Sequence, residues 1–308
     1  MKSWLSRNRQ RVVQFVGTVL AIVLIAVLLR EQGWQAVVDA MKQIQPIDLL
    51  WVAILFLISR TAVVARWHVL LRAGDVPISF KDSAMLTFTG LFASNFLPTT
   101  IGGDVLRMAG AMKMGYDKAV CLASIVGDRI VGMFGMFMVA PLGLYYTWVA
   151  LPARSLGMMS FLGFLKKPID FTKRTFLTFS IWFKKPGSLL LSLGFSWIHM
   201  ICLFLSIYIF LADLGYPISF WMIAGLWSLT YFITQVPISI NGYGLQELSF
   251  TFLFSRVAGV PPAISLTVSI LIRAYLVLAS LPGAFFLPSA LAAMTEKQNS
   301  VTETDITL

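Results

Sequence analysis

Long apolar runs separated by short polar stretches dominate the chain and predict helices that cross a membrane. The runs long enough for a full span, about 18 residues or more, are Val12–Leu29, Ile47–Leu71, Ala119–Leu151, Leu189–Leu211 and Ala263–Leu287. Two further runs end in breaks. Ser83–Phe96 holds only about 14 residues, short for a span, and Ile218–Pro237 precedes a separate helix over Leu245–Val257. The stretch Gly33–Gln45 has mixed polarity and predicts a short amphipathic connecting helix.

Two of the apolar segments are interrupted in a similar way. In each break a proline closes an apolar helix, glycines follow, and a carboxylate stands at the start of the next helix. These residues are Pro98, Gly102, Gly103 and Asp104 in the first break, and Pro237, Gly242, Gly244 and Glu247 in the second. Such breaks free backbone groups that lipid cannot satisfy, so they must line protein or a watered cavity. Matching interruptions in two halves of a chain point to a transporter's binding site and are compatible with an inverted repeat.

The half-helices after the breaks are candidates for binding an anion. A helix N-terminus carries about half a positive charge and unpaired N–H groups, which suits a phosphate. Arg107, one turn into its helix, would add a permanent positive charge. A structural explanation is equally open. Asp104 could be an N-cap and Glu247 the third-position acid of a cap at Gly244, with the prolines and glycines serving packing alone.

The composition identifies the apolar runs as parts of a membrane protein. Hydrophobic residues make up 58 % and charged residues 12 % of the 308 residues, against roughly 45–50 % and about 25 % in soluble domains. The mean hydropathy is +0.81. One soluble core could not bury this much apolar surface, and two cysteines cannot form a disulfide framework. We therefore predict an all-α polytopic membrane protein with about seven or eight hydrophobic segments, two of them broken or re-entrant.

The net charge of +10 is concentrated in two places. Met1–Arg11 carries four basic residues and no acid, and residues 151–186 carry seven basic residues and one acid. Basic clusters beside apolar spans mark cytoplasmic loops and attract anionic headgroups, so a membrane surface explains them better than nucleic acid does. The N-terminus is therefore expected in the cytoplasm, before a first helix that is retained. The aromatic and basic segment 151–186 is expected to lie in the membrane interface.

The side of the membrane that segment 151–186 occupies stays open. If Ser83–Phe96 dips in and returns, Arg107, Lys113 and Lys118 lie inside and the segment lies outside. If Ser83–Phe96 crosses fully, the segment lies inside, as the charge rule favours. One membrane domain is expected over residues 1–290, and the polar tail over 291–308 is expected to be disordered.

Several charged side chains interrupt the apolar runs, where burying each costs roughly a few kcal/mol. They are Arg60, Arg66, Asp128, Arg129 and Arg273. Arg60 and Arg66 are expected to extend to the headgroups, whereas the other two arginines are expected to have partners. Asp128 and Arg129 point apart along their helix, so Asp128 should meet Arg107 or the arginine of the last span. A structural ion pair and a substrate contact are both open.

The sequence contains no catalytic or cofactor motif. His68 and His199 are far apart and have no metal-ligand companions, so a zinc site is not supported and both are expected to be packing or interface residues. Neither a phosphate-binding loop nor a Gly-x-Ser-x-Gly motif is found. We therefore expect no catalytic residue, no metal and no other cofactor.

The breaks and the buried charges together resemble a known family. The resemblance rests, in chain order, on Arg66-Trp67, Asn95, Pro98, Gly102, Gly103, Asp104, Arg107, Asp128, Arg129, Pro237, Gly242, Gly244, Glu247 and Arg273. This pattern is similar to that of the flippase-like family whose best-known member is the membrane domain of bacterial lysylphosphatidylglycerol synthases. The resemblance implies a lipid-handling transport fold with re-entrant helices in the inner membrane of a prokaryote. It makes the motif residues from Asn95 onward candidates for binding an anionic, aminoacylated or polyprenyl-phosphate-linked lipid.

Three functions are compatible with these features. The leading prediction is a transporter that moves an anionic or carrier lipid between leaflets. A membrane-embedded enzyme that uses Asp104 and Glu247 as acid and base is a rival, but the sequence offers no nucleophile and no soluble aminoacyl-transfer domain follows the last span. The third is a scaffold for a separate lipid-modifying enzyme. The headgroup, the energy coupling and the existence of a homo-oligomer stay open.

Overall fold

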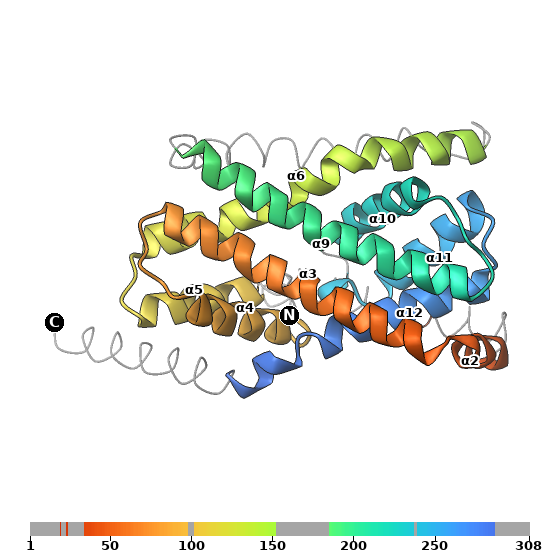
Figure 1. The fold of residues 1–308 in the computed structure, drawn as a ribbon, viewed down its shortest axis with the longest axis horizontal. Coiled ribbons are helices and arrows are strands. Elements are labelled where there is room, and N and C mark those ends of the chain that lie inside the picture. The colour runs from red at the N-terminus through yellow and green to blue at the C-terminus, as the bar shows by residue number, and fades with distance from the viewer. Residues whose placement is uncertain are drawn as a thin grey trace, which may run out of the picture.

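Helices and turns make up all of the described chain, which contains no strand (Figure 1). The computed structural model describes residues 34–97, 102–151, 185–236 and 239–286, together with Val19 and Val23. The helices are α2 (Trp34–Gln43), α3 (Pro46–Ala73), α4 (Phe80–Ser94), α5 (Gly102–Lys113), α6 (Lys118–Ala150), α9 (Pro186–Asp213), α10 (Phe220–Thr234), η1 (Ile240–Gly242), α11 (Leu245–Val257), α12 (Pro262–Leu278) and η2 (Leu281–Phe285). The all-α prediction is confirmed. Apart from the two valines, the predicted first span lies outside the described residues, as do residues 152–184 and the polar tail.

Within the described ranges, four helical segments are long and apolar enough to cross a membrane: α3, α6, α9 and Pro262–Phe285, which joins α12 to η2. They correspond to four of the five full spans that the sequence predicts. Proline stands in the first turn of α3, α9 and α12. There its missing N–H costs nothing and its fixed φ favours the helix. These prolines set where each span begins.

The two broken segments form helical hairpins. α4 turns back into α5 and α10 turns back into α11, and the two arms of each hairpin pack together. The arms are 12 to 15 residues long, shorter than the roughly 20 residues of a full span. α4 and α5 approach closely because Gly90 faces Gly103. A Cβ on Gly103 would collide with the carbonyl oxygen of Gly90, so this contact requires glycine.

The tips of the two hairpins meet inside the protein. Asn241 Nδ2 donates to Asn95 Oδ1 at 3.5 Å, and Asn95 Nδ2 donates to Ser280 Oγ at 2.8 Å. Just beyond Ser280, η2 lies against α4, where a Cβ on Gly283 would collide with the carbonyl oxygen of Phe88. The first break is therefore tied both to the second hairpin and to the end of the last span.

The helices after α2 form two sets that correspond in order and packing and, except for the last helix of each set, in length. α3 and α9 each have 28 residues, and α4 and α10 each have 15. The same Pro-Ile-Ser-Phe sequence, at 77–80 and 217–220, leads from the long helix into the hairpin in both sets. α3 and α9 pack against each other and run in opposite directions (Figure 1). This is the arrangement of an inverted repeat, with α3 to α6 and α9 to α12 as its two units.

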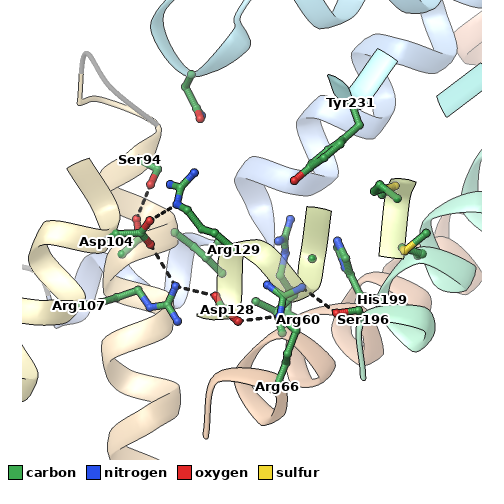
Figure 2. Close-up of a pocket in the computed structure, with 17 residues that line it drawn as sticks. Arg60, Arg66, Ser94, Asp104, Arg107, Asp128, Arg129, Ser196, His199 and Tyr231 are labelled. Atoms are coloured by element: carbon green, nitrogen blue, oxygen red, sulfur yellow. Dashed lines mark hydrogen bonds and ion pairs between the residues drawn. The ribbon is translucent and has the colours of Figure 1, made fainter. Parts of the chain in front are cut away.

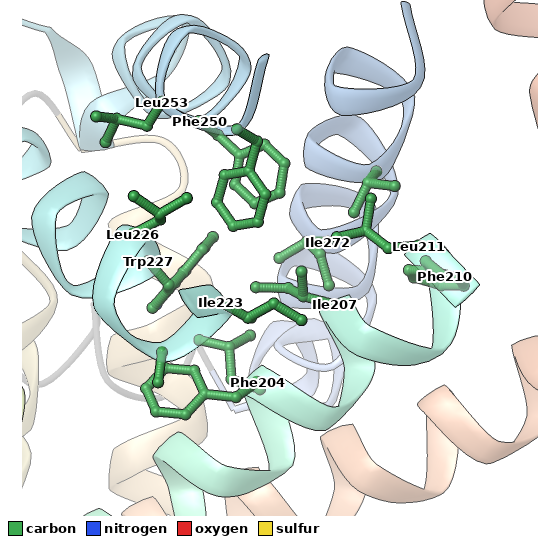
Figure 3. Close-up of a cluster of buried hydrophobic side chains, with 14 of the residues drawn as sticks. Phe204, Ile207, Phe210, Leu211, Ile223, Leu226, Trp227, Phe250, Leu253 and Ile272 are labelled. Carbon is green, nitrogen blue, oxygen red and sulfur yellow. The ribbon is translucent and has the colours of Figure 1, made fainter. Parts of the chain in front are cut away.

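A large apolar cluster holds the second unit together (Figure 3). Phe204 of α9, Trp227 of α10 and Phe250 of α11 meet in it, and all three are buried. α6 of the first unit joins the second through a close crossing with α10, because a Cβ on Gly143 would collide with the carbonyl oxygen of Gly225. Close-packed side chains of this kind resist deformation. The second unit is therefore expected to be rigid where it faces the first unit.

The ends of the helical body differ from the predicted topologies. Because the α4–α5 hairpin returns, Lys118 at the start of α6 lies at the same end as the end of α3, and one apolar cluster covers both. Lys185, just before α9, lies there too, in an ion pair with Asp75 at 2.7 Å. α6 runs away from this end, so the last turn of α6 and the first turn of α9 lie at opposite ends of the helical body (Figure 1). Both predicted topologies place all of segment 151–186 on one side, which is wrong for its two flanks.

Candidate functional site

A cavity of about 280 Å³ lies between the two repeat units, among α3, α4, α5, α6, α9 and α10 (Figure 2). Its charged lining residues are Arg60, Arg66, Asp104, Arg107, Asp128 and Arg129, and Ser94, Ser196, His199, Tyr231 and Asn241 add polar groups. Arg60 and His199 stand at the middle of α3 and α9, respectively. The cavity therefore lies midway along α3 and α9. In a bilayer this is the depth at which a buried charge costs the most free energy.

An alternating chain of ion pairs crosses the cavity (Figure 2). Arg66 Nε donates to Asp128 Oδ1 at 2.7 Å, and Arg107 Nη1 donates to Asp128 Oδ2 at 3.2 Å. The same Nη1 donates to Asp104 Oδ1 at 3.2 Å, and Arg129 Nε donates to Asp104 Oδ2. Each carboxylate thus lies between two arginines. The chain joins α3, α5 and α6, and it leaves one more positive than negative charge among its five members.

Neighbouring residues fix how these arginines point. Arg107 lies over the Trp67 ring, with its guanidinium carbon 4.1 Å from the ring centroid, a cation–π contact. Arg66 Nη1 donates to Ser196 Oγ at 3.2 Å. Gly132 leaves the room for this guanidinium, since a Cβ there would lie 2.9 Å from Arg66 Nη1. The guanidinium groups are therefore held in place across the helix contacts.

Arg60 lines the same cavity but stands apart from the chain of ion pairs. Arg60 is only 7 % exposed, and its Nε has no hydrogen-bond partner. Among the described residues no carboxylate lies within ion-pair distance of Arg60. Its neighbour Ser59 shares a hydrogen bond of 2.6 Å with His199 Nδ1. The cavity therefore holds a buried guanidinium with free donor capacity beside an imidazole.

The polar groups of the second break bond to one another rather than facing the cavity. Glu247 Oε2 accepts the N–H of Gly244 at 2.8 Å, and Glu247 Oε1 accepts Arg273 Nε at 2.8 Å. Arg273 also donates to the carbonyl oxygens of Gly242 at 3.1 Å and of Asn241 at 3.4 Å. Gly242 and Gly244 have φ of +71° and +75°, where a side chain would be strained. Of the two roles that the sequence leaves open for Glu247, the structure shows the cap at Gly244, and Arg273 holds the turn in place.

The two breaks carry corresponding charge pairs. Asp104 and Glu247 are each the third residue of the half-helix after a break. Their partners Arg129 and Arg273 are each the twelfth residue of the span that follows. The pairs differ in setting, because Arg273 clamps a backbone turn whereas Arg129, 35 % exposed in its side chain, faces the cavity. Of the two pairs, Asp104 and Arg129 in the first unit therefore line the cavity, whereas Glu247 and Arg273 in the second unit do not.

The order of spans, breaks and buried charges can be compared with known families. The family model for the lysylphosphatidylglycerol synthase TM region matches residues 14–166 and 155–283. The chain belongs to this family. Both hairpins and all residues that line the cavity fall within the matched ranges. No curated protein and no solved structure matches the chain significantly.

Four of the predicted site residues of this family member meet at the cavity: Asp104, Arg107, Asp128 and Arg129. The other described candidates shape the breaks instead and do not line it: Asn95, Gly102, Gly103, Gly242, Gly244, Glu247 and Arg273. Pro98 and Pro237 lie outside the described residues. Asp104 stands in the first turn of α5, which begins at Gly102, and not at the N-cap.

The structure also corrects several expectations for the charged residues. Asp128 pairs with Arg107, as predicted, and with Arg66, which was expected to extend to the headgroups and does not. Arg60 is likewise buried. His199, expected to be a packing or interface residue, bonds to Ser59 across the contact of α9 with α3 and also lines the cavity. A charge at the middle of an apolar run was the available signal for both arginines, but the sequence alone does not show which face of α3 meets α6.

Proposed function

We propose that this membrane protein transports a lipid between leaflets, with the headgroup passing through the arginine-lined cavity. The observation that carries the proposal is the concentration of four arginines and two aspartates midway along the spans. Charges at this depth are costly and in membrane proteins mark the path of a polar substrate. Because the arginines outnumber the aspartates, the headgroup is anionic. Membership in a family of lipid-synthase membrane domains supports a lipid as the molecule that enters.

The hairpins supply the moving parts in this proposal. Each enters the membrane as a half-length helix, turns at mid-depth and returns to the same side, so both are re-entrant. The contact between Asn95 and Asn241 at their tips closes the space between the units. Rocking one repeat unit against the other would open the cavity to either leaflet in turn. The acyl chains stay in the bilayer while the headgroup crosses.

We further propose an orientation in the cytoplasmic membrane of a prokaryote. Among the described residues, five basic ones stand at the end of the body where the α4–α5 hairpin begins, Arg72, Lys81, Lys113, Lys118 and Lys185, and two at the other end, Lys42 and Arg256. Lysine and arginine are enriched on the cytoplasmic side. The end with five is therefore cytoplasmic, and α3 starts outside, which agrees with an N-terminus inside before one earlier span.

The proposal assigns no catalytic role to the carboxylates. Asp104 and Asp128 each lie between two arginines, and both oxygens of each carboxylate accept hydrogen bonds from these arginines. Acid–base catalysis instead needs a carboxyl oxygen that faces the proton it exchanges. The two carboxylates act as counter-charges that set the arginine positions, and no cofactor takes part.

Leaflet exchange in sealed vesicles tests the proposal. The purified protein is reconstituted with a headgroup-unmodified fluorescent phosphatidylglycerol, and the fraction that an impermeant quencher can bleach is followed in time. The wild-type protein should speed the exchange over empty vesicles, and Arg129→Gln should slow it. Lys42→Gln, at an exposed position on α2, is the matched control and should exchange like the wild type. No exchange for any anionic lipid, or equal exchange by Arg129→Gln and wild type, would overturn the proposal.

A further inference from the structure

The cavity carries more positive charge than its own carboxylates neutralise. Among the described residues that line it, four arginines (Arg60, Arg66, Arg107 and Arg129) stand with two carboxylates (Asp104 and Asp128), a formal excess of two positive charges. The hairpin-tip residues outside the described ranges, Pro98–Ile101 and Pro237–Ile238, are uncharged in the sequence. We propose that the cavity selects a lipid whose headgroup carries two negative charges, a phosphate monoester or a diphosphate, and that Arg60 is the residue that recognises the second charge.

This proposal depends on Arg60, because no other residue in the described part of the chain supplies it with a counter-charge in the cavity. It is 93 % buried, its Nε has no hydrogen-bond partner, and the ion-pair chain of the other three arginines leaves it out. Arginine keeps its charge when buried, because its pKa is far above neutral. A buried unpaired charge is strongly unfavourable unless a partner arrives. The partner must then be an anion that enters the cavity.

The chemistry of a phosphate fits the donors that are left. Besides Arg60 Nε, the Nε and Nη2 of Arg107 have no hydrogen-bond partner. Guanidinium groups bind phosphate oxygens with two parallel N–H donors. The cavity of about 280 Å³ has the volume of roughly nine liquid waters, enough for one or two phosphoryl groups. His199, held through Ser59 at 2.6 Å, adds a ring nitrogen at the same wall.

The net charge of the headgroup distinguishes the lipid classes that the proposed transport function leaves open. A phosphate monoester carries about −1.5 to −2 at neutral pH, which matches the excess in the cavity. A phosphodiester such as phosphatidylglycerol carries a single negative charge and leaves one arginine uncompensated. An aminoacylated headgroup adds a cation, which the arginines repel. The inference rests on the proposed lipid transport for the identity of the anion as a lipid, and it narrows that proposal to one class.

Lipid competition on the purified, delipidated protein tests the class. Phosphatidic acid, phosphatidylglycerol and lysylphosphatidylglycerol with identical acyl chains are mixed in equal amounts, and the bound lipid is read by native mass spectrometry. We expect phosphatidic acid to bind most tightly and lysylphosphatidylglycerol least. In Arg60→Gln the affinity for phosphatidic acid should fall about 10- to 100-fold, as for a lost hydrogen bond between charged groups, and its advantage over phosphatidylglycerol should disappear. Equal binding of the three lipids, or an unchanged preference in Arg60→Gln, overturns the inference.

Soluble anions separate a lipid phosphate from a free one. Inorganic phosphate and inorganic diphosphate are added in increasing amounts to the complex with phosphatidic acid. Displacement only at large excess supports a lipid, because the acyl chains add apolar burial that free anions lack. Displacement by equimolar free phosphate would make this a soluble-anion site and overturn the lipid assignment.

Thermal unfolding distinguishes recognition from a structural role of Arg60. Without lipid, Arg60→Gln should melt at the same or a higher temperature than the wild type, because it removes an unpaired buried charge. Added phosphatidic acid should raise the melting temperature of the wild type and of Arg60→Lys, but not of Arg60→Gln. A lower melting temperature for Arg60→Gln without lipid would overturn the inference.

The experiments can contradict lipid transport and headgroup recognition by Arg60 independently. Exchange of phosphatidylglycerol without any preference for phosphatidic acid removes the lipid class and leaves transport intact. A preference for phosphatidic acid without leaflet exchange of any lipid leaves the recognition by Arg60 intact and removes transport.

Discussion

Arg66 of α3 donates from Nε to Oδ1 of Asp128 on α6 at 2.7 Å, across 62 positions of sequence. The side chains are 11 % and 4 % exposed, so the pair is shielded from water by the packed helices. Arg107 shares the second oxygen of Asp128. One carboxylate thus fixes two arginines from two other helices, and this contact connects the stability of the first repeat unit to the charge of the cavity.

Loss of the Asp128 charge should destabilise the protein strongly. Asp128→Asn leaves Arg66 and Arg107 buried without their shared counter-charge, and we expect the free energy of unfolding to fall by about 3–5 kcal/mol. Unfolding in mixed micelles measures it. Asp39→Asn, which removes an exposed pair with Lys42, is the control and should cost less than about 1 kcal/mol. A loss for Asp128→Asn no larger than that of the control would show that the ion-pair chain is not structural.

The close approach of α4 and α5 predicts a strict need for glycine at one position. Gly103→Ala places a Cβ against the carbonyl oxygen of Gly90 and Oγ of Ser94, and overpacking of this kind costs about 1–3 kcal/mol. Gly194→Ala on α9 is the matched control, because a Cβ there meets nothing within 4 Å and alanine favours the helix. Melting temperatures should fall for the first variant and hold or rise for the second. An unaffected Gly103→Ala would contradict the hairpin packing.

The contact between the hairpin tips predicts a cross-link. Asn95 and Asn241 touch at 3.5 Å, and the native Cys121 and Cys202 are buried. The double variant Asn95→Cys, Asn241→Cys should therefore be joined by a short bifunctional thiol reagent, whereas each single variant should not. Joining the tips should also stop leaflet exchange until a reducible linker is cleaved. Free exchange in the fully cross-linked protein would mean that the tips do not separate during transport.

The proposed orientation predicts which side of the membrane each end faces. Lys118→Cys at the start of α6 and Asp39→Cys on α2 are at exposed positions of opposite ends. An impermeant thiol reagent added to intact cells should label Asp39→Cys and spare Lys118→Cys, and opened cells should expose both. The reverse labelling would invert the topology.

Much of the helical layout follows from local sequence, and the cavity does not. The helix α11 has the predicted bounds, Leu245–Val257, because Gly244 and Glu247 form a local cap whose chemistry is readable from spacing alone. The burial of Arg66 depends instead on which face of α3 meets α6, and its partner lies 62 residues away. Local patterns cannot set that choice, since Arg66 near a helix end can equally extend to the headgroups. Sequence thus located the breaks and most of the charges, whereas tertiary packing determined their partners.

Blocking the cavity itself is the most direct test that a headgroup passes through it. Leu91 of α4 lines the cavity, so Leu91→Cys offers a thiol there. The variant is reconstituted, its leaflet exchange of an anionic lipid is measured, and the thiol is then labelled with a bulky reagent. We predict that labelling abolishes exchange, and that excess anionic lipid slows the labelling because it occupies the cavity. Undiminished exchange by the fully labelled protein would contradict a transport path through the arginine-lined cavity.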